Sequence, residues 1–242
     1  MTCSQHLPQL DQLSELPDAE IGLALLRHIS DLDQIFMCRG NVFSNIAQHH
    51  AGGSEKETLR ALIAEGWQWL ESERLIAWAG NEMNQDSYVI TRRGRRALEE
   101  DDPLRSIEAE NLVASRLHPR LTRRIRNQFL VGECELAAFA AIREVEIRVR
   151  ELGGFDDSFI GVPLMRAAFN PTGGPLRDPD LDSGEAEQTS ALFAGAIGVF
   201  KNPSSHRQVE FDDPIEASEV ILLADLLLRM LDEKAAKIGL GR

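Results

Sequence analysis

The sequence is poor in cysteine and in aromatic residues. Its three cysteines, Cys3, Cys38 and Cys134, lie far apart, so they form neither a paired zinc motif nor an even set of disulfide partners. No apolar run approaches the roughly 20 residues that a membrane span needs. The N-terminus has neither the basic start nor the apolar middle of a secretory signal. We therefore expect a reduced, cytoplasmic protein that does not enter a membrane.

What is abundant is negative charge, although it is unevenly spread. The 242 residues carry a net charge of −13, which argues against indiscriminate binding of nucleic acid by the whole surface. Residues 101–150 are the exception, with 9 basic and 8 acidic residues. Two basic runs stand out, and from them we select Arg92, Arg93, Arg120, Arg123 and Arg124 as candidate contacts to nucleic acid. The alternative is that both runs are solvated helix faces.

The first hundred residues follow a mixed helix and hairpin pattern. After a polar lead-in over residues 1–17, periodicity and capping signals predict the following elements: helices over 18–35, 41–50 and from Ser54 to about 70, strands in 75–80 and 87–94 that pair as a hairpin, and a short helix through Leu98 capped by Thr91. Trp67 and Trp69 fall in the longest helix and are expected to pack in the core of this region.

This order of elements resembles the winged helix-turn-helix family. The string LESERLIAW…SYVITRRGRRALEE is similar to the wing region, and the resemblance covers residues 18–100. It implies DNA binding, with the long helix in the major groove. Glu55, Glu57 and Glu65 on that helix, and Glu82 and Asp86 at the wing tip, would oppose phosphate. Contact with another protein, or positioning of the second domain, is therefore the preferred role.

The remainder of the chain is expected to be helical, so the protein as a whole is mainly α. Asp101-Asp102-Pro103 is the expected break between domains, since proline starts a new element. Helices are then predicted over 106–117, 118–131, 134–152, 162–169, 185–200 and 214–234, with a loop rich in proline and glycine over 170–184. The apolar stripes of residues 136–149 and 221–231 are expected to form core or dimer surface.

The segment that suggests chemistry is SALFAGAIGVFKNPSSHR, over residues 190–207. An apolar helix ends there in Lys201, Asn202-Pro203 stops it, and His206 follows. A lysine can hold the charge of a phosphate, and a histidine can transfer a proton near neutral pH. The alternative to a functional role is that Lys201 only complements the helix dipole and that His206 only packs in a loop.

The second half also resembles the HEPN superfamily, more narrowly its abortive-infection-like branch of prokaryotic toxins and antiviral defence proteins. The residues that carry the resemblance are LHPRL at 117–121, GVPLMRAAF at 161–169, LFAGAIGVFKNPSSHR at 192–207 and ASEVILLADLLLRMLD at 217–232. It covers residues 106–235 and implies a helical bundle, a homodimer and a metal-independent endoribonuclease whose site lies between two copies.

The catalytic residues that this resemblance implies are Lys201, Asn202 and His206. The family motif is an arginine, then a polar residue and then a histidine, with four to six residues lying between the arginine and the histidine. Lys201 replaces the arginine, and an ammonium lacks the paired hydrogen bonds of a guanidinium. Arg207 is the candidate for supplying a guanidinium instead. His206 would act as acid or base on the RNA 2′-hydroxyl, Lys201 would neutralise the phosphate, and Asn202 would hold the loop.

A second interpretation is a binding module from a different functional class. In it the bundle is a catalytically inactive dimerisation module, and the winged helix binds DNA or serves as an adaptor in a defence complex. The expected partners are RNA, a second copy of the chain, and an antitoxin or another defence protein. Neither a cofactor nor a metal is expected. Chelator-resistant RNA cleavage would favour the enzyme, and salt-dependent DNA binding with intact RNA would favour the module.

Overall fold

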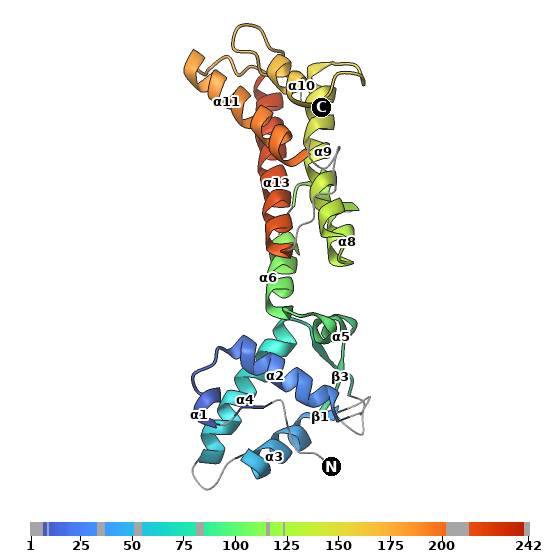
Figure 1. Ribbon diagram of the computed structural model, residues 1–242, viewed down its shortest axis with the longest axis vertical. Coiled ribbons are helices and arrows are strands. Elements are labelled where there is room, and N and C mark those ends of the chain that lie inside the picture. Colours follow the sequence, from blue (N-terminus) through green and yellow to red (C-terminus); the bar gives the residue numbers. More distant parts are fainter. Residues whose placement is uncertain are drawn as a thin grey trace. The chain divides into compact units, whose positions relative to one another are not determined.

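The computed structural model is mainly α-helical with one small sheet, as the sequence predicts (Figure 1). It describes residues 7–8, 10–32, 37–50, 55–80, 85–114, 117–122, 124–201 and 213–239. The chain forms two compact units, residues 1–107 and 108–242. In the described part of the chain, no helix combines the length and the apolar character that crossing a membrane requires.

The N-terminal unit contains five helices and three strands in its described part. They are α1 (Leu10–Leu13), α2 (Asp18–Ser30), β1 (Met37–Cys38), α3 (Arg39–His50), α4 (Glu55–Ser72), β2 (Ile76–Trp78), β3 (Ser87–Ile90) and α5 (Arg92–Glu99). The predicted hairpin is present as β2 and β3, which pair antiparallel. The predicted cap of α5 is confirmed, because Thr91 Oγ1 accepts a hydrogen bond from the Gly94 amide at 3.0 Å. The predicted Ser54 cap of α4 lies outside the described residues.

The N-terminal core lies between the helices and the sheet. Trp67 is 2% exposed and makes edge-to-face contacts with Phe43 and Tyr88, at ring-centroid distances of 5.6 and 5.1 Å. The prediction that Trp67 packs in the core is therefore confirmed. Gly22 on α2 and Gly66 on α4 allow the two helices to lie close together. A Cβ on Gly66 would lie only 2.6 Å from Ile21 Cγ2.

The first strand and the end of α2 differ from the prediction. The expected helix over 18–35 ends at Ser30, and its C-terminal cap is Asp31. Beyond it, Met37 and Cys38 pair with Tyr88 and Ser87 and place β1 beside the central strand β3. A two-residue strand has no local pattern of its own, because the strand that it pairs with lies about fifty residues away along the chain.

The first helix of the second half contains the boundary between the two units. The described elements are α6 (Pro103–Ala114), α7 (Pro119–Thr122), α8 (Arg124–Leu130), α9 (Cys134–Gly153), α10 (Gly161–Ala168), α11 (Ser183–Ala196), η1 (Ile197–Lys201) and α13 (Pro214–Lys237). The division falls after Ile107, inside α6. This helix begins at Pro103 rather than Ser106, because proline suits a first turn and the Arg105 amide donates to Asp102 Oδ1 at 3.3 Å.

The centre of the C-terminal unit is the pair formed by α9 and α13, which lie side by side (Figure 1). Their buried apolar residues include Ala138, Ile142, Val145 and Val149 on α9 and Ile221, Ala224, Leu228 and Leu231 on α13. Most members of the predicted stripes are therefore core, although Leu136 is 47% exposed. Phe169 after α10 stacks on Phe193 of α11 with ring centroids 4.3 Å apart and joins these helices to the same core.

One other helix prediction needs correction. Of the helix expected over 118–131, the structure describes α7 and α8, and residue 123 between them lies outside the described residues. The helix expected over 185–200 begins at Ser183, because Asp182 and Glu185 form a capping box, and its last residues form the π-helical turn η1. The predicted ends at Gly132 and Gly154 are confirmed, and both glycines have positive φ angles, of 87° and 68°.

Candidate functional site

The candidate site begins with the wide turn that ends α11. Residues Ile197–Lys201 form a π-helix, a rare geometry that occurs mostly as single turns and is frequent at functional sites. Ile197 is fully buried and Phe200 packs against the core of the unit. These two apolar anchors fix the turn, and Lys201 stands at its end.

Lys201 is held by a buried carboxylate rather than directed into open solvent. Its side chain is 13% exposed, and its Nζ lies 3.4 Å from Glu146 Oε2. Glu146 lies on α9 and is 3% exposed. The ammonium group of Lys201 is thus placed by an element more than fifty residues earlier in the chain.

The Glu146 carboxylate receives two further hydrogen bonds. Arg150, one turn later on α9, donates to Oε1 at 2.9 Å, and the Gly161 amide donates to Oε2 at 2.8 Å. Both oxygens are therefore satisfied, which a buried charge requires. We call Glu146, Arg150, Lys201 and the Gly161 amide the Glu146 cluster.

The Glu146 cluster joins three helical elements at one point and carries excess positive charge. Arg150 also donates through Nε to the Phe159 carbonyl at 3.1 Å, which fixes the loop before α10. With Arg150 and Lys201 ionised, two positive charges face one carboxylate. The formal charge of the cluster's described members is therefore about +1.

Sequence reasoning selected Lys201 but missed Glu146 and Arg150. Glu146 follows Ile142 by four residues and precedes Val149 by three, which places it on the buried stripe of α9. An acidic residue at such a position needs a cation, and Arg150 stands at the favourable i,i+4 spacing. This signal was present in the sequence, although nothing in it indicated that Lys201 would be the second cation.

The other residues of the predicted catalytic motif follow directly after the described turn. Asn202, His206 and Arg207 lie outside the described residues. Lys201 is therefore the one predicted catalytic residue that the structure positions. The segment that carries the histidine starts at a positively charged cluster.

Arg120 belongs to a separate ion-pair network and is not part of the Glu146 cluster. Its guanidinium contacts the Glu151 carboxylate and lies 3.6 Å from Glu144 Oε2. Such pairing lowers its value as a phosphate contact. Arg123 and the side chain of Arg124 lie outside the described residues, so the prediction for them stays a prediction.

His118 is a buried residue with hydrogen bonds to both ring nitrogens. Nε2 lies 2.9 Å from Asp232 Oδ2, and Nδ1 accepts from the Arg120 amide at 3.3 Å. Arg148 donates to the same Asp232 carboxylate at 2.8 Å. Burial raises the pKa of Asp232, but the hydrogen bonds from His118 and Arg148 outweigh it and hold this pKa below its ordinary value. Because Pro119 begins α7, the expected helix start is confirmed.

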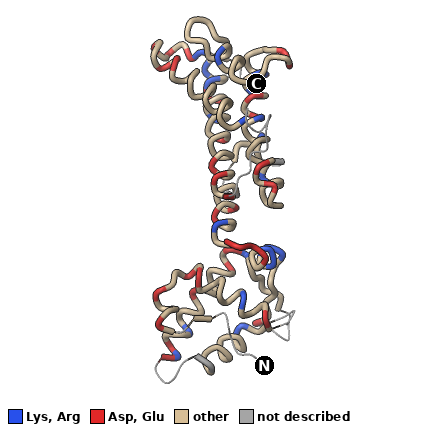
Figure 2. The backbone as a smooth tube through the Cα atoms, in the orientation of Figure 1, with Lys and Arg blue, Asp and Glu red and all other residues tan. Residues whose placement is uncertain are grey.

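The basic run of the N-terminal unit lies on α5, which stands out as a blue segment in Figure 2. Arg93 donates to the Glu73 carbonyl at 2.9 Å, and its guanidinium lies 3.7 Å from the Glu73 carboxylate. It thus ties α5 to the end of α4, a structural role. Arg92 is exposed, so a role in binding nucleic acid stays a prediction for it.

No set of three or more histidine, cysteine, aspartate and glutamate side chains suited to a metal occurs in the described part of the chain. Residues 115–231, which include most of the C-terminal unit, are similar to a family described as "Protein of unknown function (Hypoth_ymh)". The matched range contains Glu146, Arg150 and Lys201. No curated protein and no solved structure matches the chain.

Proposed function

We propose that the C-terminal unit is a metal-independent endoribonuclease of a prokaryotic antiviral defence or toxin system. The observation that carries this proposal is the Glu146 cluster. It holds Lys201 in place where the chain enters the segment with Asn202 and His206. Cleavage of a phosphodiester held by Lys201 would need a group that transfers protons, and His206 is the proposed one.

The chemistry needs few groups, because RNA supplies its own nucleophile. His206 takes the proton of the 2′-hydroxyl, the oxygen attacks phosphorus, and the bond to the 5′-oxygen breaks. The histidine of a second copy gives that oxygen a proton. Lys201 and Arg150 stabilise the charge on the non-bridging oxygens. The products are a 2′,3′-cyclic phosphate and a 5′-hydroxyl.

A homodimer would bring two such sites together, and α11 offers a face for it. The exposed residues Ala191, Leu192, Gly195 and Val199 follow one side of the helix and of η1, with Leu192 43% and Val199 62% exposed. A Cβ on Gly195 would meet nothing within 4 Å, so a second backbone has room to approach. We call these four residues the α11 stripe, and pairing along it would bring both copies of Lys201 toward one groove.

For the N-terminal unit we propose a winged helix-turn-helix that acts as an adaptor. Its order of helix, strand, two helices and hairpin supports this assignment. Glu55, Glu57 and Glu65 along α4 disfavour a phosphate backbone. An antitoxin or another defence protein fits this helix better than DNA does.

A second candidate function is an inactive dimerisation module, and one observation favours it. The ammonium of Lys201 already contacts the Glu146 carboxylate, and an arginine would have offered a wider, two-pronged contact to phosphate. In this alternative, the Glu146 cluster only stabilises the bundle. The two candidates differ in whether RNA is cut.

The experiment is incubation of the purified chain with total RNA in the presence of a chelator. We expect cleavage that the chelator does not abolish. His206→Ala should slow cleavage by about 100-fold or more, since general acid–base help is typically worth that much. Lys201→Ala should also slow cleavage, whereas its control Lys56→Ala, on the exposed surface of α4, should retain full activity. Intact RNA, or equal cleavage by His206→Ala, would refute the enzyme.

A further inference from the structure

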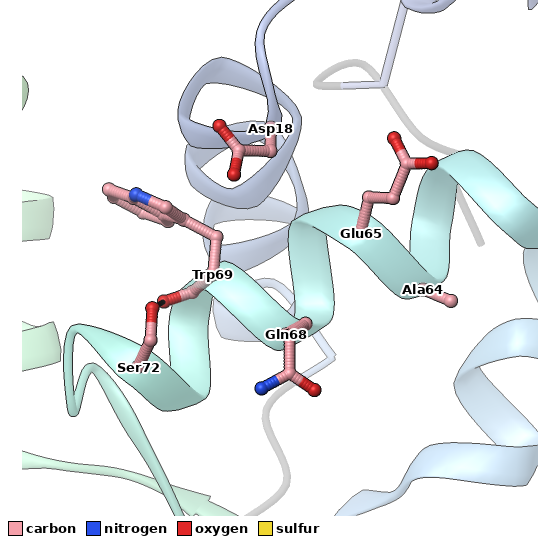
Figure 3. Close-up of a pocket in the computed structure, with 6 residues that line it drawn as sticks. All are labelled: Asp18, Ala64, Glu65, Gln68, Trp69 and Ser72. Carbon is pink, nitrogen blue, oxygen red and sulfur yellow. Dashed lines mark hydrogen bonds between the residues drawn. The ribbon is translucent and has the colours of Figure 1, made fainter.

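A pocket of about 560 Å³ opens on the N-terminal unit where α2 meets α4 (Figure 3). Its lining residues are Asp18, Ala64, Glu65, Gln68, Trp69 and Ser72. All but Asp18 lie on α4, the long helix whose acidic residues disfavour DNA. Trp69 packs against the N-terminal core as expected, and because it is only half-buried it also lines this pocket.

The indole ring of Trp69 is a fixed wall of the pocket. It lies against the α2 backbone at Gly22, where an added Cβ would stand only 2.4 Å from Trp69 Cε3. A larger residue at position 22 would displace the ring. The Trp69 carbonyl also accepts a hydrogen bond from Ser72 Oγ at 2.8 Å, as Figure 3 shows. The contact with Gly22 restricts the ring, so a ligand that stacks on it would pay little entropic cost to order it.

Two carboxylates line the same pocket as this ring. Glu65 precedes Trp69 by one helical turn, and Asp18 comes from the start of α2 (Figure 3). Both residues are exposed, and within the described part of the chain neither carboxylate has an ion-pair partner. The amide of Gln68 adds a neutral acceptor. An aromatic face with two carboxylates is the chemistry that binds an organic cation.

We propose that this pocket binds a cationic side chain presented by a basic segment of a partner protein. Arginine fits better than lysine, because a guanidinium stacks on indole and donates several hydrogen bonds to carboxylates in one plane. Phosphate would be repelled by the same two carboxylates. The pocket lies in the unit that does not contain Lys201, so this inference does not depend on the nuclease proposal.

The test uses the full chain with ¹⁵N-labelled tryptophan and a capped pentapeptide, Gly-Arg-Gly-Arg-Gly. The chain has three tryptophans, which supply internal controls. Trp67 is buried, and Trp78 lies outside the pocket and donates through its indole to the Gln85 carbonyl at 2.6 Å. We expect the Trp69 indole signal, assigned with Trp69→Phe, to shift saturably while the other two change little.

Two charge-matched variants separate the pocket from the general acidity of the surface. Asp18→Asn with Glu65→Gln should weaken peptide binding by about fivefold or more, because two carboxylates next to the cation are lost. Glu219→Gln with Glu233→Gln removes the same charge from exposed positions of α13 and should leave the affinity within about twofold.

Three outcomes would overturn the proposal. The first is a lack of any saturable shift of the Trp69 signal. The second is equal weakening by the pocket variant and the α13 variant, which would indicate attraction by net charge alone. The third is a tighter response of the Trp69 signal to duplex DNA than to the arginine peptide. A matching peptide with glutamine in place of arginine should leave the signal unchanged.

Discussion

A carboxylate with almost no access to water is the residue on which the C-terminal site is built. Glu146 is 3% exposed, and its charge is tolerated because Arg150, Lys201 and the Gly161 amide surround it. A buried ion pair is worth little in net stability, yet removing one partner leaves the others uncompensated. The geometry of Lys201 therefore depends on Glu146.

Glu146→Gln should destabilise the C-terminal unit by about 3–5 kcal/mol, since it leaves two cations without their carboxylate. Denaturant unfolding monitored by circular dichroism measures this. Glu144→Gln on the same helix is the control, because the Glu144 side chain is 28% exposed, and its ion pair with Arg120, at 3.6 Å, should contribute no more than about 1 kcal/mol. Equal effects of the two changes would mean that the Glu146 cluster does not hold the site together.

Asp178 offers a test that depends on pH. It is 5% exposed, and its carboxylate accepts from Lys237 at 3.0 Å, with Lys234 Nζ 3.7 Å away. The hydrogen bond from Lys237 holds the pKa of Asp178 below its ordinary value. A lowered folded-state pKa stabilises the protein above the unfolded pKa, near about 4, and this contribution is lost as the pH falls through the folded pKa.

We therefore expect the difference in unfolding free energy between the parent and Asp178→Asn to be constant from about pH 6 to 8 and to shrink below about pH 4. Denaturant titrations at a series of pH values measure it. The raised pKa of Lys237, caused by its hydrogen bond to Asp178, acts only at high pH. A difference that grows on acidification would contradict this assignment of the pair.

At the scale of the elements, Gly22 and Gly66 determine how closely α2 and α4 pack. A Cβ on Gly66 would lie 2.6 Å from Ile21 Cγ2 and 2.9 Å from the Gly22 amide nitrogen, and the latter is backbone that cannot rotate away. We expect Gly66→Ala to push the helices apart and to destabilise the N-terminal unit by about 1–3 kcal/mol, despite the better helix propensity of alanine. Thermal unfolding measures this.

Thr58→Ala, at an exposed position of the same helix, is the control for Gly66→Ala and should change stability by less than about 0.5 kcal/mol. Stabilisation by Gly66→Ala would show that α2 and α4 are not held at this distance.

The α11 stripe gives a prediction about assembly. A glutamate at Leu192 or Val199 would place a charge in an apolar helix pair, so either variant should raise the dimer dissociation constant by about tenfold or more. Analytical ultracentrifugation measures it. Leu226→Glu is the control, because Leu226 on α13 is 54% exposed and lies outside the stripe. Loss of the dimer in Leu226→Glu alone would place the interface elsewhere.

Elements with a local signature could be predicted, and those that depend on distant contacts could not. Apolar periodicity and the glycine after it define α9, and Asp213 with Pro214 marks the start of α13. The short strand β1 exists because β3 offers it backbone partners. The π-turn η1 follows from how Ile197 and Phe200 pack, which the apolar pattern of α11 does not specify.

For the whole molecule, the sequence predicts a mainly α protein, while the site could be predicted only in part. Lys201 was selected from its place before Asn202 and His206, but a one-dimensional pattern did not show that Glu146 and Arg150 meet it. Arg93 and Arg120 were selected as contacts to nucleic acid because they lie in basic runs of the sequence. Their acidic partners, Glu73 and Glu151, could not be identified from the sequence. The acidic pocket at Trp69 likewise depends on α2 and α4 coming together.

The measurement that tests the central claim most directly is end-group analysis of RNA cut by the full chain with a chelator present. The substrate is an oligonucleotide, compared with a copy that carries 2′-deoxy sugars at the cut sites. We predict a 2′,3′-cyclic phosphate and a 5′-hydroxyl, no cutting at deoxy positions, and loss of activity in His206→Ala. Products with a 3′-hydroxyl and a 5′-phosphate, cleavage at deoxy positions, or uncut RNA would contradict it.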